Sequence, residues 1–228
     1  MHPITEARLV ATPHVQSIGL MRFDATGETL MQPDGCWDIV IFKRDDEVEV
    51  LRTGLTTRSV IHRHAAGDEI LVISFKPSSF MPSMPGEMMR DEGVVLEKFG
   101  KRKFRIGGDW REIPTFDNAD VFVERLVRDG IVDSNAVVAS IVDGQPKAMS
   151  ERTMQRHFLR TTGLTHKHFT LVQRARKAVA LLQRGQPAAD VAFALGYADQ
   201  AHMINSLRQI MGQTPRQIVR AASLAAQQ

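Results

Sequence analysis

The sequence predicts an α+β fold, in which a mostly-β, barrel- or sandwich-like N-terminal domain precedes an all-α C-terminal domain. Three observations predict it: strand-type segments fill the first part of the chain, helical spacing of apolar residues begins at Asp117, and positive charge concentrates in the last third. The expected divisions are residues 1–115 for the β domain, 116–133 for a connecting helix and 134–228 for the helical domain.

The N-terminal region contains five segments rich in β-branched and aromatic residues and bounded by Gly, Pro or Asp, which is typical of short strands. Asp45 and Asp46 stand between two of them and are predicted to turn a hairpin. Residues 77–93, interrupted by prolines, are expected to be irregular with one helical turn. Several short strands at this spacing indicate a small barrel or sandwich. The predicted strands are residues 15–23, 36–44, 47–52, 58–64 and 69–76.

From Asp117 onward, apolar residues recur at helical spacing between capping residues and glycines. Residues 117–130 are the first such segment, and Gly130 is predicted to stop it. Residues 143–149 are predicted to form a loop, because Gly and Pro interrupt them. The other predicted helices are residues 134–142, 151–162, 168–184, 187–195 and 199–211, with a last turn or two after residue 214.

Charge is unevenly distributed along the chain. Residues 150–220 contain 11 Lys and Arg against 3 Asp and Glu, a net charge of +8, whereas the remainder contains 18 against 23, a net charge of −5. A basic segment attached to an acidic body indicates a module that binds a polyanion. A solvated charged surface is the alternative, which net charge alone leaves open.

Composition and motifs exclude several classes of protein. The chain has no apolar run of about 18 residues and no signal-peptide pattern, so no membrane span or secretion is predicted and the cytoplasm is the expected location. Cys36 is the single cysteine, which excludes an intramolecular disulfide and a multi-cysteine zinc site. No nucleotide-binding glycine motif or nucleophilic triad is recognisable, so neither an enzyme nor a cofactor is expected.

The stretch "SERTMQRHFLRTTG", residues 150–163, concentrates positive charge on one short predicted helix. At about 100° per residue, Met154 and Phe158 point to one side, and three arginines and a glutamine gather on the other. A major groove admits one helix, and Arg and Gln side chains suit bidentate hydrogen bonds to guanine and adenine. The predicted base-reading residues are Arg152, Gln155 and Arg156, and Arg160 is predicted to contact phosphate.

Residues 187–211 predict a helix-turn-helix unit, with a short helix, a turn at Gly196 and a second helix. Met203, Leu207 and Ile210 are expected to anchor the second helix. Asn side chains suit adenine, and Arg side chains reach phosphates. The predicted base readers of this unit are Gln200, His202 and Asn205, and the further predicted phosphate contacts are Lys167, Arg208 and Arg216.

A longer predicted helix, residues 168–184, separates the two reader helices. A helix of this length spans about 25 Å. With its flanking turns, such a strut would hold two reader helices about one DNA turn apart, near 34 Å. One chain could then contact two successive major grooves on one face of a duplex.

Two segments resemble the DNA-binding unit of the AraC/XylS transcriptional regulators. "DVAFALGYADQAHMINSLRQIMGQTPRQI" resembles that family's signature segment, and "SERTMQRHFLRTTGLT" resembles its first reader helix. The resemblance covers about residues 134–220. It implies a double helix-turn-helix domain that binds double-stranded DNA through the six base-reading positions named above. It also implies a bacterial transcription regulator, with RNA polymerase as a partner if the protein is an activator.

The N-terminal half resembles a bacterial module found before such DNA-binding units. The matching pieces are "PDGCWDIVI", residues 33–41, and "ISFKPSSF", residues 73–80. The resemblance implies that this domain senses a small-molecule effector or mediates self-association, so a homodimer is a further expectation.

A metal site is the alternative function. "HRHAAGDE" places His62, His64 and Glu69 at the spacing of a cupin metal motif, and residues i and i+2 of a strand share a face. A metal-dependent cupin-type enzyme or sensor would use these three residues. The glycine framing of that motif is missing, and no downstream strand provides a third histidine at a suitable spacing.

Three other patterns have competing interpretations. Cys36 is either a redox-sensing thiol or a small buried hydrophobe. The methionines of residues 81–89 either line an effector pocket or pack in the core. The basic run at residues 99–105 either contacts DNA or an acidic partner, or is a solvated hairpin.

Overall fold

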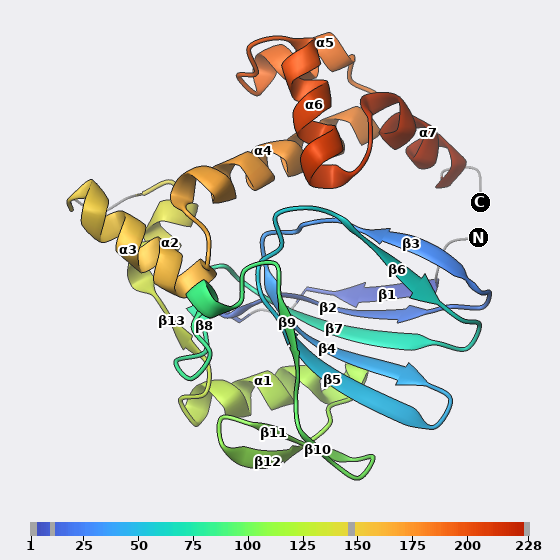
Figure 1. Ribbon diagram of the computed structural model, residues 1–228, viewed down its shortest axis with the longest axis vertical. Helices are drawn as coiled ribbons and strands as arrows, with labels where there is room; N and C mark the ends of the chain where they lie inside the picture. The colour runs from blue at the N-terminus through green and yellow to red at the C-terminus, as the bar shows by residue number, and fades with distance from the viewer. Residues whose placement is uncertain (1–3, 10–11, 146–148, 226–228) are drawn as a thin grey trace. The chain divides into compact units, whose positions relative to one another are not determined.

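The computed structural model describes residues 4–9, 12–145 and 149–225 (Figure 1). The chain divides into two compact units: the first comprises residues 1–29, 36–56 and 63–166, and the second comprises 30–35, 57–62 and 167–228. Residues 134–166 therefore group with the strands, whereas the sequence predicts a boundary before residue 134. Among the described residues, no helix has the length and apolarity needed to span a bilayer.

The first unit is built on a six-stranded sheet with the order β1-β2-β7-β4-β5-β9, in which all neighbours are antiparallel. A two-residue turn at Asp45 and Asp46 joins β4 to β5. Asp45 adopts a φ of 52°, a left-handed conformation that a short polar side chain tolerates. The strands are β1 Ile4–Arg8, β2 Val15–Arg22, β4 Trp37–Arg44, β5 Glu47–Thr53, β7 Glu69–Phe75 and β9 Gly93–Val95.

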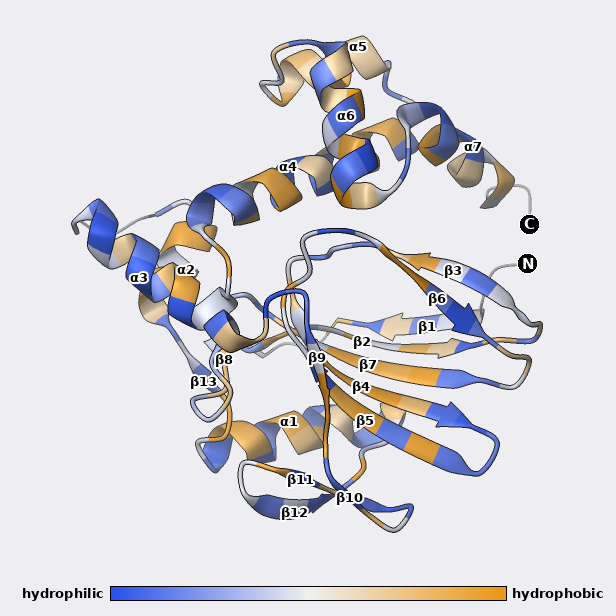
Figure 2. Ribbon diagram, viewed as in Figure 1, coloured by the Kyte–Doolittle hydropathy of each residue, from blue (hydrophilic) through white to orange (hydrophobic). Residues whose placement is uncertain are grey.

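One face of this sheet forms the core of the unit. Ile18, Ile39 and Ile73 lie opposite one another on neighbouring strands and are fully buried. Figure 2 shows apolar colouring along much of β4 and β7, with hydrophilic colouring toward one end of each strand. Helix α1 (Ala119–Arg128) joins this core, where the rings of Phe104 and Phe122 have centroids 5.9 Å apart.

Arg52 connects the sheet to the irregular segment that follows β7. Its side chain is fully buried and lies over the ring of Trp37, 4.7 Å from the centroid. The guanidinium donates to the carbonyl oxygens of Thr53, at 3.0 Å, and Met84, at 3.3 Å. Trp37 in turn donates to the carbonyl oxygen of Ser79 at 2.6 Å. Burial lowers the pKa of Arg52 to about 10, so the guanidinium stays charged at neutral pH.

Shorter strands and helices accompany the main sheet. β11 pairs with both β10 and β12 in a three-stranded sheet, and β8 pairs with β13. β3 and β6 form a further two-stranded sheet. Their bounds are β3 Gly27–Met31, β6 Val60–His64, β8 Ser79–Phe80, β10 Lys98–Phe99, β11 Lys103–Ile106, β12 Asp109–Glu112 and β13 Asp133–Ser134. The helical segments are η1 Gly86–Met88, η2 Phe116–Asn118, α2 Ala136–Val142 and α3 Glu151–Thr162.

The second unit is helical and has its own hydrophobic core. Its helices are α4 His166–Gln183, α5 Ala188–Ala194, α6 Gln200–Met211 and α7 Pro215–Ala225. Small residues on α4, Ala175 and Ala178, are fully buried and leave room for larger side chains from the other helices. Those larger residues include Leu182, Val191, Met203, Leu207, Met211 and Ile218.

The predicted fold class is confirmed: a mostly-β region is followed by a helical region. All five predicted strands are present. The described strands do not close into a barrel, because the main sheet ends in β1 on one side and in the three-residue β9 on the other. Short strands such as β9 and β12 were not predicted, since they have only three and four residues. Within the predicted loop 143–149, residues 146–148 lie outside the described residues.

Replacing Arg52 by Ala should destabilise the protein by about 2–4 kcal/mol, because it removes the donor from two partly buried carbonyl groups and opens a cavity under Trp37. Chemical denaturation followed by circular dichroism measures the change in unfolding free energy. Arg63→Ala is the matched control: the Arg63 side chain is 84% exposed and its loss should change stability by less than about 0.5 kcal/mol. Equal stability of the two variants would contradict a structural role for Arg52.

Candidate nucleic-acid interface

Helix α3 has well-defined ends. The Ser150 hydroxyl accepts a hydrogen bond from the Thr153 amide at 3.2 Å, which satisfies one free donor of the first turn. Gly163 ends the helix with a φ of 76°, and its amide donates to the Leu159 carbonyl at 2.8 Å. Phe158, fully buried, fixes the rotation of the helix, as its spacing predicts.

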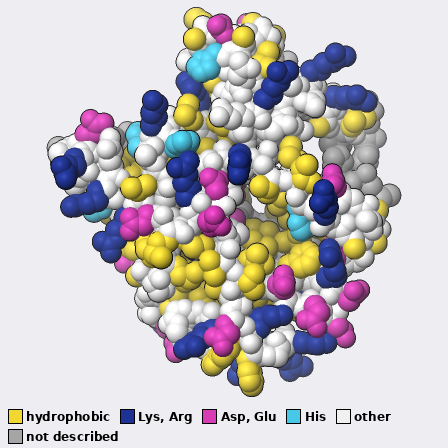
Figure 3. Space-filling view, viewed as in Figure 1, with side chains coloured by type: hydrophobic (Ala, Val, Ile, Leu, Met, Phe, Trp, Pro, Cys, Tyr) yellow, Lys and Arg dark blue, Asp and Glu magenta, His cyan; other side chains and the backbone are white. Residues whose placement is uncertain are grey.

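The opposite face of α3 is polar and exposed. Arg152, Gln155, Arg156 and Arg160 all lie on it, and Figure 3 shows Lys and Arg side chains gathered over this helix. The Gln155 amide donates to the Glu151 carboxylate at 3.0 Å, one turn earlier on the same helix. Presenting that amide to a base requires breaking this exposed contact, which costs about 0.2–0.5 kcal/mol.

Asn135 connects α3 to the start of α2. Its carbonyl oxygen accepts from the amides of Val137, at 3.0 Å, and Val138, at 3.3 Å, and so caps α2. Its amide nitrogen donates to the Thr161 hydroxyl at 2.9 Å and to Nδ1 of His157 at 3.2 Å. One side chain therefore caps the leading helix and orients the reader helix, a role that its sequence position does not indicate.

The end of α3 packs directly against η1. A Cβ atom added to Gly86 would overlap the Thr161 carbonyl oxygen and lie 2.7 Å from the Gly163 amide nitrogen. A Cβ added to Gly163 would in turn overlap the Gly86 carbonyl. Thr161 and Thr162 are buried beneath this contact. Two glycines therefore permit a backbone-to-backbone approach that no side chain could occupy.

Helices α5 and α6 form the second helix-turn-helix. Gly196, with a φ of 67°, allows the turn between them. The Asp199 carboxylate accepts from the His202 amide at 2.7 Å and caps α6. Met203, Leu207 and Met211 are fully buried on α6. Ile210, predicted as an anchor, is half-buried, because Met211 occupies the core position next to it.

The exposed face of α6 carries the predicted readers Gln200, His202 and Asn205, with Arg208 one turn further on. The Ala198 amide donates to Nδ1 of His202 at 3.3 Å. Because Nδ1 accepts, the proton of a neutral imidazole lies on Nε2, which leaves that nitrogen as a donor. The Tyr197 ring meets the His202 ring edge-on, 5.5 Å between centroids, and restricts its orientation.

Arg174 of α4 supports this turn and was not predicted from the sequence. Its guanidinium lies over the Tyr197 ring, 4.3 Å from the centroid, and donates to the Gly196 carbonyl at 3.3 Å. Arg174 therefore holds the turn that precedes α6, and through Tyr197 it orients His202. No local sequence signal reveals this role, since Arg174 and Tyr197 are more than twenty residues apart.

The predicted phosphate contacts are also exposed. Arg160 ends the exposed face of α3, Lys167 lies in the first turn of α4, and Arg216 lies in the first turn of α7. The structure therefore brings three predicted base readers together on α3 and three on α6, with exposed cations at or near the helix ends.

The alternative metal site is not assembled. His64 stacks on Phe23, 3.9 Å between centroids, and its ring nitrogens contact the Ala25 carbonyl at 3.0 Å and the Thr29 hydroxyl at 3.3 Å. Glu69 accepts from Lys43 and Arg22, both at 3.0 Å, instead of facing the imidazoles of His62 and His64. Across the described part of the chain, no group of three His, Cys, Asp or Glu side chains is placed to hold a metal. The described residues therefore do not assemble the metal site that the cupin-type interpretation requires.

The structure also places the residues of the three other competing interpretations. Cys36 is buried at 4% exposure and packs as a small hydrophobe. Met81 and Met89 belong to the buried core, whereas Met88 is exposed, so these methionines do not form a continuous pocket lining. The basic run at residues 99–105 spans the β10–β11 hairpin.

Comparison with known proteins identifies the C-terminal segment. Residues 147–221 match the model of a family described as a helix-turn-helix domain. No curated protein matches the chain. Crystal structures of ToxT from Vibrio cholerae are similar at 8% identity, covering 96% of this chain and 98% of theirs, with a TM-score of 0.40 for the P21 form and 0.44 for the protein from strain O395.

The helix-turn-helix domain carries exposed Arg, Gln and Asn side chains on α3 and α6, the second helix of each helix-turn-helix. These features are those of a DNA-binding protein of the kind that regulates transcription. The segment is a helix-turn-helix domain of the AraC type, which confirms the resemblance to the AraC/XylS regulators.

Replacing Gly86 by Ala should lower the unfolding free energy by about 1–3 kcal/mol, because the added methyl group forces α3 away from η1. Gly93→Ala is the matched control, since a Cβ there meets its nearest atom only at 3.9 Å. Thermal and chemical denaturation compare the two variants. If Gly86→Ala is as stable as Gly93→Ala, the close approach does not constrain the helix.

Proposed function

We propose that this protein is a sequence-specific transcription regulator that reads two sites on double-stranded DNA, one with α3 and one with α6. The observation that carries the proposal is the pair of capped, core-anchored helices whose exposed faces bear Arg, Gln and Asn. The proposal assigns no catalytic step and needs no cofactor.

Base reading by α3 rests on Arg152, Gln155 and Arg156. Arg pairs bidentately with guanine, and Gln with adenine. Arg152 and Arg156 are one turn apart, so both can enter one groove. On α6, Asn205 is suited to adenine, and Gln200 and the Nε2–H group of His202 supply further donors near the start of the helix.

Phosphate contacts would set the register of these helices on the duplex. Arg160, Lys167, Arg208 and Arg216 are exposed and supply the charge. Helix α4 has 18 residues and is therefore about 27 Å long. This length suits a spacing near 34 Å between two readers once the flanking turns are added.

The N-terminal β region would control the readers through a small-molecule effector or through self-association as a homodimer. The contacts of α3 with Asn135 and Gly86 support such control, because a shift in these elements moves the reader helix itself. RNA polymerase would be a partner if the protein activates transcription.

Arg156→Ala should weaken binding to the specific site by about 1–3 kcal/mol while sparing nonspecific affinity, because a base contact is lost. Arg160→Ala, on the same helix, is the matched control and should weaken specific and nonspecific binding equally. In vitro selection from random duplexes gives the site, and fluorescence anisotropy with selected and scrambled DNA measures both affinities. Equal losses for Arg156→Ala would make Arg156 a phosphate contact.

Affinity for DNA should fall steeply as salt rises. If four phosphates are neutralised, the slope of log K against log salt is about −3.6. Anisotropy titrations across a series of salt concentrations measure this slope. A flat dependence would contradict the proposed electrostatic contacts.

A further inference from the structure

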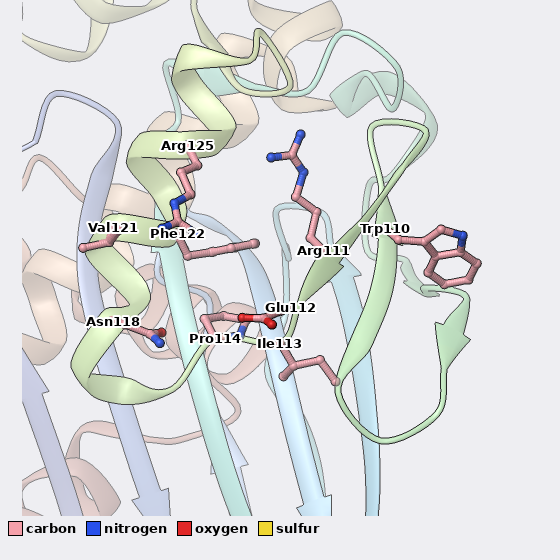
Figure 4. A pocket seen from close by; sticks show the side chains of 9 residues that line it. All are labelled: Trp110, Arg111, Glu112, Ile113, Pro114, Asn118, Val121, Phe122 and Arg125. Atoms are coloured by element: carbon pink, nitrogen blue, oxygen red, sulfur yellow. The ribbon is translucent and has the colours of Figure 1, made fainter.

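A pocket of about 290 Å³ lies between α1 and β12 in the first unit, away from the residues assigned to DNA. One wall is a single stripe of α1, because Asn118, Val121, Phe122 and Arg125 are spaced at i, i+3, i+4 and i+7. The other wall runs from β12 into Ile113 and Pro114 (Figure 4).

The pocket combines an apolar floor with cationic walls. Phe122 and Ile113 supply apolar surface, while Arg111 and Arg125 extend from opposite walls (Figure 4). Arg125 has no ion pair or side-chain hydrogen bond within the described part of the chain. Nε–H of Arg111 is buried and donates to no acceptor there either. Because that atom has no exposed surface and the other nitrogens of Arg111 donate to Asp129 and Asp109, Arg125 is the guanidinium whose donors are open to the pocket.

The remaining charges around the pocket limit the charge of a ligand. The Arg111 guanidinium donates to Asp129 at 2.6 Å and to Asp109 at 3.4 Å, and its hydrogen bond lowers the pKa of the Asp129 carboxyl. Glu112 is the acidic side chain of the lining. Arg125 is thus the guanidinium of the lining without a carboxylate partner among the described residues, and a dianion would meet repulsion from Glu112, Asp109 and Asp129.

We propose that this pocket binds a small monoanion with an apolar body, such as an alicyclic or aliphatic carboxylate. Its carboxylate pairs with Arg125, and its apolar part covers Phe122 and Ile113. At about 30 Å³ per water-sized group, the volume holds about ten non-hydrogen atoms. The amide of Asn118 borders the same space.

The pocket has a short covalent path to the first reader helix. Arg125 precedes Asn135 by ten residues in the sequence. The chain between these two residues contains β13, which pairs with β8. Asn135 then caps α2 and bonds Thr161 of α3. A ligand that braces α1 against β12 therefore restrains the segment that orients α3. This consequence for DNA binding rests on the proposed function, whereas ligand binding itself does not.

Isothermal titration calorimetry of the full chain with cyclohexanecarboxylate tests the site. Cyclohexylmethanol and cyclohexylmethylamine are probes of nearly the same shape, neutral and cationic. We expect the acid to bind at least tenfold more tightly than the alcohol, and the amine not to bind. Arg125→Ala should weaken the acid at least tenfold, because a charge-assisted pair is lost. Arg128→Ala, an exposed arginine on the same helix outside the pocket, should change it less than twofold.

Three results would overturn the assignment: no heat with the acid, equal affinities for the three probes, or equal binding to Arg125→Ala and Arg128→Ala. Anisotropy with selected DNA then tests the coupling. Saturating acid should change DNA affinity at least threefold in the wild type and not in Arg125→Ala. Unchanged affinity refutes the coupling alone. Acid binding without any DNA binding would refute the proposed function and leave the pocket standing.

Discussion

The close approach between η1 and the end of α3 is the constraint on which the first reader depends. Gly86 and Gly163 bring two backbones to a distance that admits no Cβ atom. Such a contact fixes position more tightly than side-chain packing, because backbone atoms cannot change rotamer. The chain that leads to η1 is itself held by Arg52 and Trp37 of the main sheet, which donate to the carbonyl oxygens of Met84 and Ser79. The position of α3 therefore depends on contacts that lead back to the β-sheet.

The two reader helices are supported in different ways. Helix α3 is held by glycines of the β unit and by Asn135, whereas α6 is held by helices α4 and α5. On the α6 side, Arg174 and Tyr197 replace the close backbone contact with a cation–π pair. A conformational change in the β-strands of the first unit would thus move α3 directly. The division of the chain, which groups α3 with the strands and α6 with the second core, agrees with this difference.

Charge serves separate purposes in the β region and on the two reader helices. In the β region most arginines are paired, as Arg44 is with Asp68 and Arg22 is with Glu6 and Glu69. On α3 and α6 the arginines assigned to DNA form no ion pair within the described residues. Unpaired, exposed guanidinium groups remain available to phosphates and bases, whereas paired ones stabilise the fold modestly. The basic C-terminal third is therefore distinct in pairing as well as in number.

Local sequence determined which segments are strands and helices, where α3 and α6 are capped, and which of their residues are exposed. Ser150, Gly163, Asp199 and the apolar spacing on each helix carry that information, because capping and periodicity involve neighbours within a few residues.

The tertiary structure alone decided the openness of the sheet and the long-range roles of individual side chains. In the folded chain, His64 and Glu69 contact other side chains and do not face one another across a metal site. The fold also gives Arg52, Asn135 and Arg174 their positioning roles. It forms the pocket between α1 and β12. These features join residues far apart along the chain, and a side chain's partner across that separation depends on how the whole unit packs.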